Sequence, residues 1–208
     1  MTVVTNGLQS RRARKKAATR SQIIAAAVRL FSEHGVEAVT VDQIAAAADV
    51  GKGTIYNYFQ TKEDIVVDFM VDLERSVQAQ VRDFKSRQRS VAGVLTNFVQ
   101  TQFRMKEHYH AFVRVFLGHM FLHTEQFLPY MAEMQKVLDP PLEALFGSLQ
   151  QRGAIRSDVD LRELILMFKT IQLGLTALWA IEGPPFQQVA RIIEQEITLF
   201  CEGLEVAR

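Results

Sequence analysis

The chain of 208 residues is long enough for one domain, or for a small module joined to a larger one. Hydrophobic residues make up 48% of it and charged residues 23%, which excludes disordered, collagen-like and disulfide-stapled proteins. Its single cysteine, Cys201, cannot form an intramolecular disulfide, and its longest uncharged stretches are shorter than the roughly 20 residues that span a bilayer. We therefore expect a cytoplasmic protein with no membrane partner.

Charge is distributed unevenly along the chain. The first 20 residues hold six Arg and Lys and no acidic residue, which leaves a net charge of −5 on the rest of a chain whose total is +1. Such a segment is either a solvated tail or a phosphate-binding arm, and charge alone does not separate the two. We expect residues 1–18 to form a flexible basic arm, and its contact with DNA stays an open alternative.

The N-terminal third of the chain predicts three short helices. They cover residues 19–34, 41–48 and 52–59. Apolar residues three and four positions apart indicate the first, and Gly35 ends it. Thr40 and Gln43 have the spacing of a capping box, which starts the second helix. The segment from Asp49 to Gly51 then interrupts the helical pattern before the third.

The remainder of the chain predicts longer helices. They cover about residues 62–87, 90–107, 109–123, 125–139, 142–152, 158–181 and 186–204. Pro140 and Pro141 cannot continue an α-helix, because proline lacks the N–H and its ring clashes with the preceding turn, so we expect a break there. No alternating strand pattern bounded by turns is found. The sequence therefore predicts an all-α protein.

Two short helices joined by a tight turn are typical of the helix-turn-helix, whose second helix lies in the major groove of DNA. The segment from Thr40 to Asp64 resembles the signature of the TetR family of bacterial transcriptional regulators. The matching features are Leu30-Phe31 and Gly35 of the leading helix, the Gly53-Thr-Ile-Tyr-Asn-Tyr-Phe59 recognition helix, and Lys62-Glu63. The resemblance covers roughly residues 19–66.

This resemblance has implications for the whole chain. It implies a DNA-binding domain over residues 19–64, and a ligand-binding and dimerisation domain over residues 65–208. It also implies a homodimer that releases a double-stranded DNA operator when a small-molecule effector binds. Thr40, Tyr58 and Lys62 correspond to positions that contact phosphates in the family.

The recognition helix supplies most of the candidate DNA contacts. Gly53 lacks a Cβ and lets the backbone approach DNA at a helix N-terminus, which is itself an anion site. Lys52 and Thr54 lie in the first turn, where they can reach base edges or phosphates. The predicted DNA-binding residues are Thr40, Lys52, Gly53, Thr54, Tyr56, Asn57, Tyr58 and Lys62.

Two of these residues also have a purely structural interpretation. Tyr56 is compatible with a partly buried core position, and Lys62 with a solvated charge. For Lys62 we favour a phosphate contact, because a cation at the start of a helix opposes the helix dipole unless an anion lies nearby. In addition, Gly51 stands where many relatives have Ser or Thr, so a helix cap is missing, and Asp49 is our candidate to replace it.

Aromatic and Met side chains are concentrated between Phe98 and Met134, which hold 12 of the 25 Phe, Tyr and Met residues. Such density is typical of a helical core and also of an apolar ligand pocket inside a bundle. The candidate contacts for an apolar or amphipathic effector are Phe69, Phe103, Phe112, Phe116, His119 and Trp179. His119 and His123 have the spacing of metal ligands on a helix, but no third ligand is fixed by spacing, so we expect no metal and no cofactor.

Residues 161–181 predict a helix that is apolar on two sides. One side can pack on its own bundle and the other on a second copy of the chain, whereas a fully internal helix is the alternative. The predicted homodimer interface comprises Leu164, Phe168, Ile171, Leu175 and Leu178 of this helix with Ile193, Ile197, Phe200 and Leu204 of the last one.

We therefore predict a ligand-responsive repressor that binds a palindromic operator as a homodimer. Two other classes stay open: an all-α ligand carrier or enzyme with a vestigial helix-turn-helix, and a helical adaptor that binds another protein. The enzyme hypothesis lacks a nucleophile, base and orienting group at recognisable spacings, so we predict that the protein is not an enzyme. The adaptor hypothesis leaves the basic arm and the segment from Lys52 to Lys62 unexplained.

Overall fold

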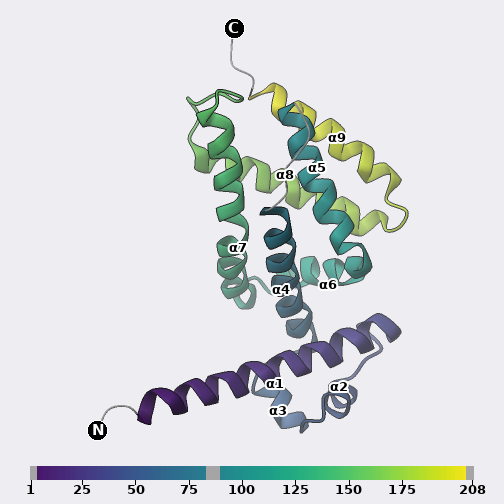
Figure 1. The fold of residues 1–208 in the computed structure, drawn as a ribbon. Helices are drawn as coiled ribbons and strands as arrows, with labels where there is room; N and C mark the ends of the chain where they lie inside the picture. The colour runs from purple at the N-terminus through teal and green to yellow at the C-terminus, as the bar shows by residue number, and fades with distance from the viewer. Residues whose placement is uncertain (1–3, 83–89, 205–208) are drawn as a thin grey trace. The chain divides into compact units, whose positions relative to one another are not determined.

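A computed structural model describes residues 4–82 and 90–204. Every regular element in these two ranges is a helix, so the all-α prediction is confirmed (Figure 1). The chain divides into two compact units, residues 1–69 and 70–208. The predicted end of the fourth helix near residue 87 lies outside the described residues.

The first unit is a three-helix domain followed by the start of a fourth helix. It consists of α1 (Val4–His34), α2 (Val41–Ala47), α3 (Lys52–Tyr56) and the first turns of α4 (Lys62–Arg82). Its core is formed by apolar side chains that are almost fully buried: Ile23, Ala27 and Phe31 of α1, Ile44 of α2, Ile55 of α3, and Phe59. The helix-turn-helix of α2 and α3 is therefore held by a small apolar core of its own.

The start of α1 corrects one prediction. The helix begins at Val4, whereas the apolar stripe predicted a start near Thr19 and a flexible arm before it. Residues 11–18 are exposed, so no apolar periodicity could indicate them. They consist of Arg, Lys and Ala, which have high helix propensity, and an existing helix can be extended through such residues at little cost.

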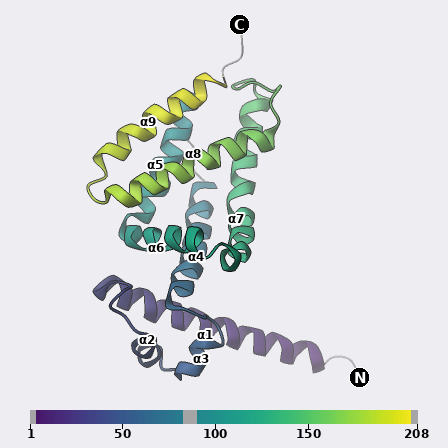
Figure 2. The same ribbon diagram turned by 180° about the vertical axis from the view of Figure 1, so that it is seen from behind.

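The second unit is a helical bundle. Besides the rest of α4 it contains α5 (Val91–Lys106), a 3-10 turn (Glu107–Tyr109), α6 (His110–Leu122), α7 (Thr124–Gln151), α8 (Leu161–Glu182) and α9 (Gln187–Glu202). α5 and α9 lie side by side in both views, and α8 contacts α6, α7 and α9 (Figures 1 and 2). Buried rings of Phe146, Phe168 and Phe200 join α7, α8 and α9, with centroids 5.3 to 6.3 Å apart.

The continuous α7 corrects a second prediction, because the helix runs through Pro140 and Pro141 without ending. Proline at position 140 removes the N–H that would bond the Lys136 carbonyl, but Lys136 is exposed and water can replace that bond. Beyond the prolines, Leu142, Phe146 and Leu149 are at most 1% exposed and anchor the C-terminal half of the helix. Packing therefore outweighs the local preference for a break.

Two further features of the bundle bear on the sequence predictions. By length and composition α8 could cross a membrane, and its Leu164, Phe168 and Leu175 are buried inside the bundle. Burial raises the pKa of the Cys201 thiol to about 11, so this side chain is an unreactive packing residue at neutral pH.

Candidate DNA-binding and effector-binding sites

The helix-turn-helix starts with the predicted capping box. The Thr40 hydroxyl oxygen accepts a hydrogen bond from the Gln43 N–H at 3.3 Å, and the Gln43 side-chain oxygen accepts one from the Thr40 N–H at 2.8 Å. These two bonds satisfy backbone donors that α2 would otherwise leave unpaired. The Thr40 hydroxyl thus has a structural role, and its phosphate contact stays a prediction.

The turn between α2 and α3 is fixed by backbone conformation and by α1. Asp49 adopts a left-handed conformation with φ of 51°, and the Gln22 side chain donates to the Ala48 carbonyl at 2.8 Å. Gly51 is the N-cap residue of α3, and it makes no side-chain cap bond. Asp49 therefore does not replace the missing cap, because no side chain caps α3 and the backbone of Asp49 forms part of the turn.

The recognition helix presents most of the predicted DNA contacts on one outward face. Ile55 and Phe59 are 1 and 2% exposed and anchor the opposite face in the core. The exposed predicted residues are Lys52, Gly53, Tyr56 and Asn57, and Thr54 and Tyr58 are half-buried. Since Tyr56 is 50% exposed, its side chain is available to a ligand from outside the domain. This placement is the geometry that major-groove recognition requires.

Lys52 is the cation of this face. Its ammonium group lies 2.8 Å from the Asp42 carboxylate, and the hydrogen bond and charge of Asp42 raise the pKa of Lys52. Both side chains are exposed, so the pair is weak and can open when a phosphate competes for the ammonium group.

Lys62 makes contacts within the domain that the sequence did not predict, and its phosphate contact stays a prediction. Its ammonium group donates to the backbone carbonyls of Val36, Glu37 and Val39 at 2.7, 2.9 and 3.2 Å. These bonds use all three N–H donors of the side chain, so a phosphate would have to compete with the carbonyls for Lys62. The partial negative charges of these three carbonyls, which lie in the α1–α2 loop, balance the ammonium charge as the expected anion would. The bonds of Lys62 thereby hold the start of α4 against this loop.

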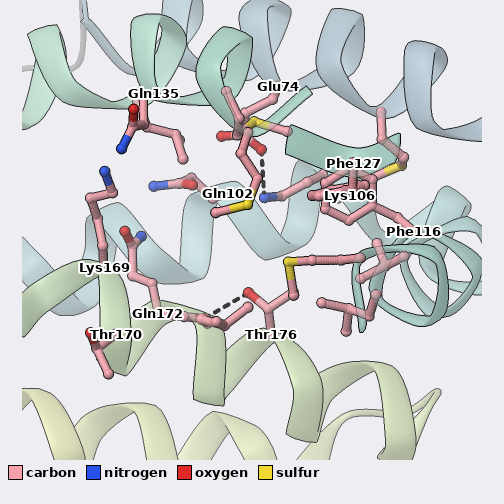
Figure 3. A pocket seen from close by; sticks show the side chains of 18 of the residues that line it. Glu74, Gln102, Lys106, Phe116, Phe127, Gln135, Lys169, Thr170, Gln172 and Thr176 are labelled. Carbon is pink, nitrogen blue, oxygen red and sulfur yellow. Dashed lines mark hydrogen bonds and ion pairs between the residues drawn. The ribbon is translucent and has the colours of Figure 1, made fainter. Parts of the chain in front are cut away.

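The second unit contains a cavity of about 370 Å³ lined by α4, α5, α6, α7 and α8 (Figure 3). Much of its wall is apolar, and four methionines contribute to it: Met70, Met120, Met131 and Met134. Phe116 and Phe127 lie together at one side of the cavity, with ring centroids 5.1 Å apart. Its volume is in the range of small-molecule sites, and flexible Met side chains can adapt to different ligand shapes.

The structure brings two of the six predicted effector contacts into this wall. Phe103 and Phe116 line the cavity, whereas Phe112 and His119 are buried beside it and are not part of its lining. Trp179 lies one layer behind, since its ring stacks on Phe103 with a centroid distance of 5.4 Å. Phe69 belongs to the first unit. Helical spacing predicts which side chains face inward, but not which of them border an empty space.

Polar groups in the wall were missed by the sequence analysis. Lys106 of α5 and Glu74 of α4 form a buried ion pair at 2.9 Å, and Gln102 lies one turn before Lys106. At another side of the cavity, Lys169 of α8 bonds Asp139 of α7 at 2.6 Å. The available signal was that Glu74, Gln102 and Lys106 interrupt otherwise apolar helix faces, where buried charges need partners.

The predicted dimer interface also needs correction. Most of its side chains are 0 to 8% exposed because they pack inside their own subunit: Leu164, Phe168, Leu175, Ile193, Ile197, Phe200 and Leu204. The prediction that α8 is apolar on two sides holds. However, the face predicted to meet a second subunit is buried in its own subunit, and the other apolar face is exposed, because periodicity does not reveal which face the bundle covers. The exposed large apolar residues of α8 and α9 are Leu166, Met167, Leu173, Leu178, Ile181 and Leu199. Of the predicted residues only Leu178 belongs to this surface, and Ile171 is half-buried.

Comparison with known proteins agrees with this architecture. Residues 23–68 match the family described as bacterial regulatory proteins, tetR family. The chain is 23% identical to the HTH-type transcriptional repressor KstR2 of Rhodococcus jostii over 190 residues, which cover 91% of this chain and 92% of the relative. Thermus thermophilus FadR, a TetR-family repressor solved with lauroyl-CoA, has a TM-score of 0.70 at 22% identity, over 91% of this chain and 96% of that chain. Bacillus subtilis FadR, solved with stearoyl-CoA, has a TM-score of 0.61 at 21% identity, over 89% and 99%.

An anchored recognition helix in one unit and a ligand-sized cavity in the other define a DNA-binding transcriptional regulator with a helix-turn-helix. By its helix-turn-helix region, residues 23–68, the chain matches the TetR family of bacterial regulatory proteins. The resemblance in the helix-turn-helix sequence is thereby confirmed, and the larger helical C-terminal domain that it implied is present.

The two lysines of the first unit should respond differently to replacement by Met. Lys62→Met removes three hydrogen bonds from a charged donor, so we expect a loss of about 2 kcal/mol in the free energy of unfolding, with an unchanged salt dependence of DNA binding per bound domain. Lys52→Met should leave stability nearly unchanged and lower the slope of log K against log salt by about one. Denaturant unfolding and DNA titrations at several salt concentrations measure both effects. If Lys62→Met lowered the salt slope and kept full stability, Lys62 would be a phosphate contact and not a structural one.

Replacement of Gly53 by Ala separates folding from DNA approach. No heavy atom lies within 4 Å of a Cβ added at Gly53, and the residue is helical, so Ala should raise the free energy of unfolding by about 0.5–1 kcal/mol. Binding to duplex DNA should nevertheless weaken, because the methyl group would stand between the backbone and the phosphates. Gly118→Ala in α6, which also has open space, is the matched control and should leave DNA affinity unaltered. Equal DNA affinity in Gly53→Ala would show that the backbone there does not approach DNA closely.

Proposed function

We propose that the protein is a cytoplasmic repressor that binds a palindromic operator as a homodimer and releases it when an elongated, largely apolar effector occupies the cavity of the second unit. The observation that carries the DNA-binding part is the outward face of α3. Lys52 and Tyr56 of α3 and its C-cap residue Asn57 are exposed there, while Ile55 and, just beyond the helix, Phe59 are buried behind it. Exposed hydrogen-bonding side chains on a rigidly anchored helix are what base and phosphate contacts need.

The effector proposal rests on the composition of the cavity. An apolar wall with a few polar groups favours a ligand with a hydrocarbon body and a small polar part. Two similar structures, the FadR proteins of Thermus thermophilus and Bacillus subtilis, hold lauroyl-CoA and stearoyl-CoA, respectively. Acyl thioesters are therefore the first class of effector that we propose for this chain.

The dimer proposal rests on the exposed face of α8. Leu166, Met167, Leu173, Leu178 and Ile181 are between 41 and 78% exposed on this one helix. Apolar residues that gather on a surface mark an interaction site, and a two-fold dimer would match a palindromic operator. The occupant that we propose for this face is a second copy of the chain.

The same elements offer a route for coupling. Leu166 and Leu173 belong both to the exposed face of α8 and to the lining of the cavity, so an effector and a partner subunit would act on the same helix. Met70 and Glu74 also line the cavity, and they belong to α4, which begins in the DNA-binding unit. An effector can weaken operator binding only by its difference in affinity for the two conformations, typically about 1–3 kcal/mol.

A pair of substitutions on α8 tests the revised dimer face. Leu178→Arg should give folded monomers, because this side chain is 44% exposed in the isolated subunit. Leu175→Arg should instead prevent folding, because it places an unpaired charge at a position that is 2% exposed. Sedimentation measures the mass, and thermal unfolding the fold. A wild-type mass of 23.6 kDa at micromolar concentration would exclude the dimer.

Operator release tests the whole proposal. Duplexes selected from random sequences by the wild-type protein should contain palindromic half-sites about one helical turn, or a multiple of it, apart. Lauroyl-CoA should weaken binding to the selected duplex, whereas free CoA, which lacks the acyl chain, should not. By thermodynamic reciprocity the operator must weaken lauroyl-CoA binding by the same factor. If lauroyl-CoA binds and operator affinity is unchanged, it is not the effector; if no duplex sequence is enriched, the repressor proposal fails.

A further inference from the structure

Four polar side chains meet inside the bundle beside the cavity. Glu74, Gln78, Gln102 and Lys106 are each at most 8% exposed, and Glu74, Gln102 and Lys106 line the cavity itself. Buried polar groups are costly unless they are hydrogen-bonded, so their orientations are strongly constrained.

Hydrogen bonds that start from the Glu74 carboxylate fix these orientations one after another. One of its oxygens accepts from Lys106 at 2.9 Å and the other from the Gln78 side-chain nitrogen at 2.6 Å. A carboxylate can only accept, so Gln78 must turn its nitrogen toward Glu74. The same nitrogen lies 3.4 Å from the Gln102 side-chain oxygen. Gln102 must therefore present its oxygen to Gln78, because the opposite orientation would set two donors against each other.

As a consequence, Gln102 directs its N–H donors away from this network. Its side-chain nitrogen is buried and has no hydrogen-bond acceptor in the described part of the chain. In Figure 3 this nitrogen points away from the Glu74–Lys106 pair, toward the part of the cavity lined by Gln135, Lys169 and Gln172. A fixed donor without an acceptor in the wall of an apolar cavity is a hydrogen-bonding site for a ligand.

We propose that Gln102 is the polar specificity contact of the cavity and donates a hydrogen bond to the carbonyl oxygen of an otherwise apolar effector. This inference rests on the proposed ligand-binding role of the cavity and specifies the group that it recognises. The hydrocarbon part of the effector lies among the methionines, Phe116 and Phe127. Met side chains that share the wall can shift to let the oxygen reach the amide.

The acceptor is an uncharged group because of the electrostatics around Gln102. Glu74 and Gln102 share the Gln78 nitrogen as donor, which places a carboxylate close to the Gln102 amide. The charge of Glu74 is already balanced by Lys106. The nearby cation of the cavity wall, Lys169, is already paired with Asp139, so a ligand carboxylate at Gln102 would add a negative charge to a poorly solvated region without an unpaired cation. A ketone, ester or thioester oxygen accepts the hydrogen bond without this cost.

A double-mutant cycle between protein and ligand tests the contact. The probes are 2-decanone and 2-methyl-1-decene, which differ only in that a CH₂ group replaces the carbonyl oxygen. Binding is followed through the fluorescence of Trp179, the single tryptophan, which stacks on Phe103 of the cavity wall. Gln102→Met should weaken 2-decanone binding about tenfold and leave 2-methyl-1-decene binding nearly unchanged, because one neutral hydrogen bond is lost.

Two further variants control for changes in packing. Gln172→Met introduces the same side chain elsewhere in the cavity wall and should alter both affinities by one common factor. Gln102→Leu removes the N–H donors with a differently shaped apolar side chain, so it should also lose the preference for the ketone. Thermal unfolding confirms that each variant is folded. An equal loss for ketone and alkene in Gln102→Met, or no binding of 2-decanone to the wild type, would overturn the proposal.

Decanoate tests the requirement for an uncharged group. Its affinity at neutral pH should be unaffected by Gln102→Met, because its carboxylate does not bind there; a loss as large as that of 2-decanone would overturn this part. The measurements use no DNA, so they are separate from the repressor test. If Gln102 discriminates the ketone while no effector releases DNA, the contact stands and the proposed function fails. If lauroyl-CoA releases the operator but Gln102 does not distinguish the ketone from the alkene, the proposed function stands and the Gln102 contact fails.

Discussion

The buried ion pair between Glu74 and Lys106 constrains much of the second unit. Removing two charges from water is costly, and their mutual attraction offsets that cost only when the remaining polar atoms are also bonded. This requirement accounts for Gln78 beside Glu74, at a position of α4 that periodicity alone would assign to an apolar residue. Gln102 of α5 accepts in turn from Gln78, and the Gln78 oxygen and the Gln102 nitrogen have no hydrogen-bond partner among the described residues. The pair therefore does more than join two helices: it gives one part of an apolar cavity a defined polarity.

The same principle acts in the first unit with backbone groups in place of a carboxylate. Lys62 begins α4, where the helix dipole disfavours a cation, and the carbonyls of Val36, Glu37 and Val39 compensate for it. A lysine in a DNA-binding domain can thus be required for binding without touching DNA. Replacement of Lys62 would disturb the junction between the helix-turn-helix and α4. Reduced DNA binding alone would therefore not distinguish a structural role of Lys62 from a direct DNA contact.

Several features could be predicted from the sequence because they depend on neighbouring residues. The capping box of Thr40 and Gln43 and the short recognition helix are local patterns, and both are present. Features that depend on distant packing were not predictable. Whether Pro140 ends α7 depends on how firmly Phe146 is packed beyond it, and the covered face of α8 depends on the rings that α7 and α9 supply. The cavity is even harder to predict from the sequence, because its wall combines residues from five helices and includes polar ones.

The polar and apolar features of α8 connect the cavity with the proposed interface. Leu166 and Leu173 are exposed apolar residues that also border the cavity, and Lys169, one turn after Leu166, is held by Asp139 of α7. A ligand in the cavity presses on α8 beside the exposed apolar surface of the same helix, because Leu166 and Leu173 belong to both. Packed helices respond to such pressure by small shifts between discrete arrangements, because close-packed interiors do not deform continuously. A shift of α8 would move the surface on which a second subunit packs, and one of α4 would move the helix that begins in the DNA-binding unit. Both consequences follow from the position of the cavity, whatever the identity of the effector.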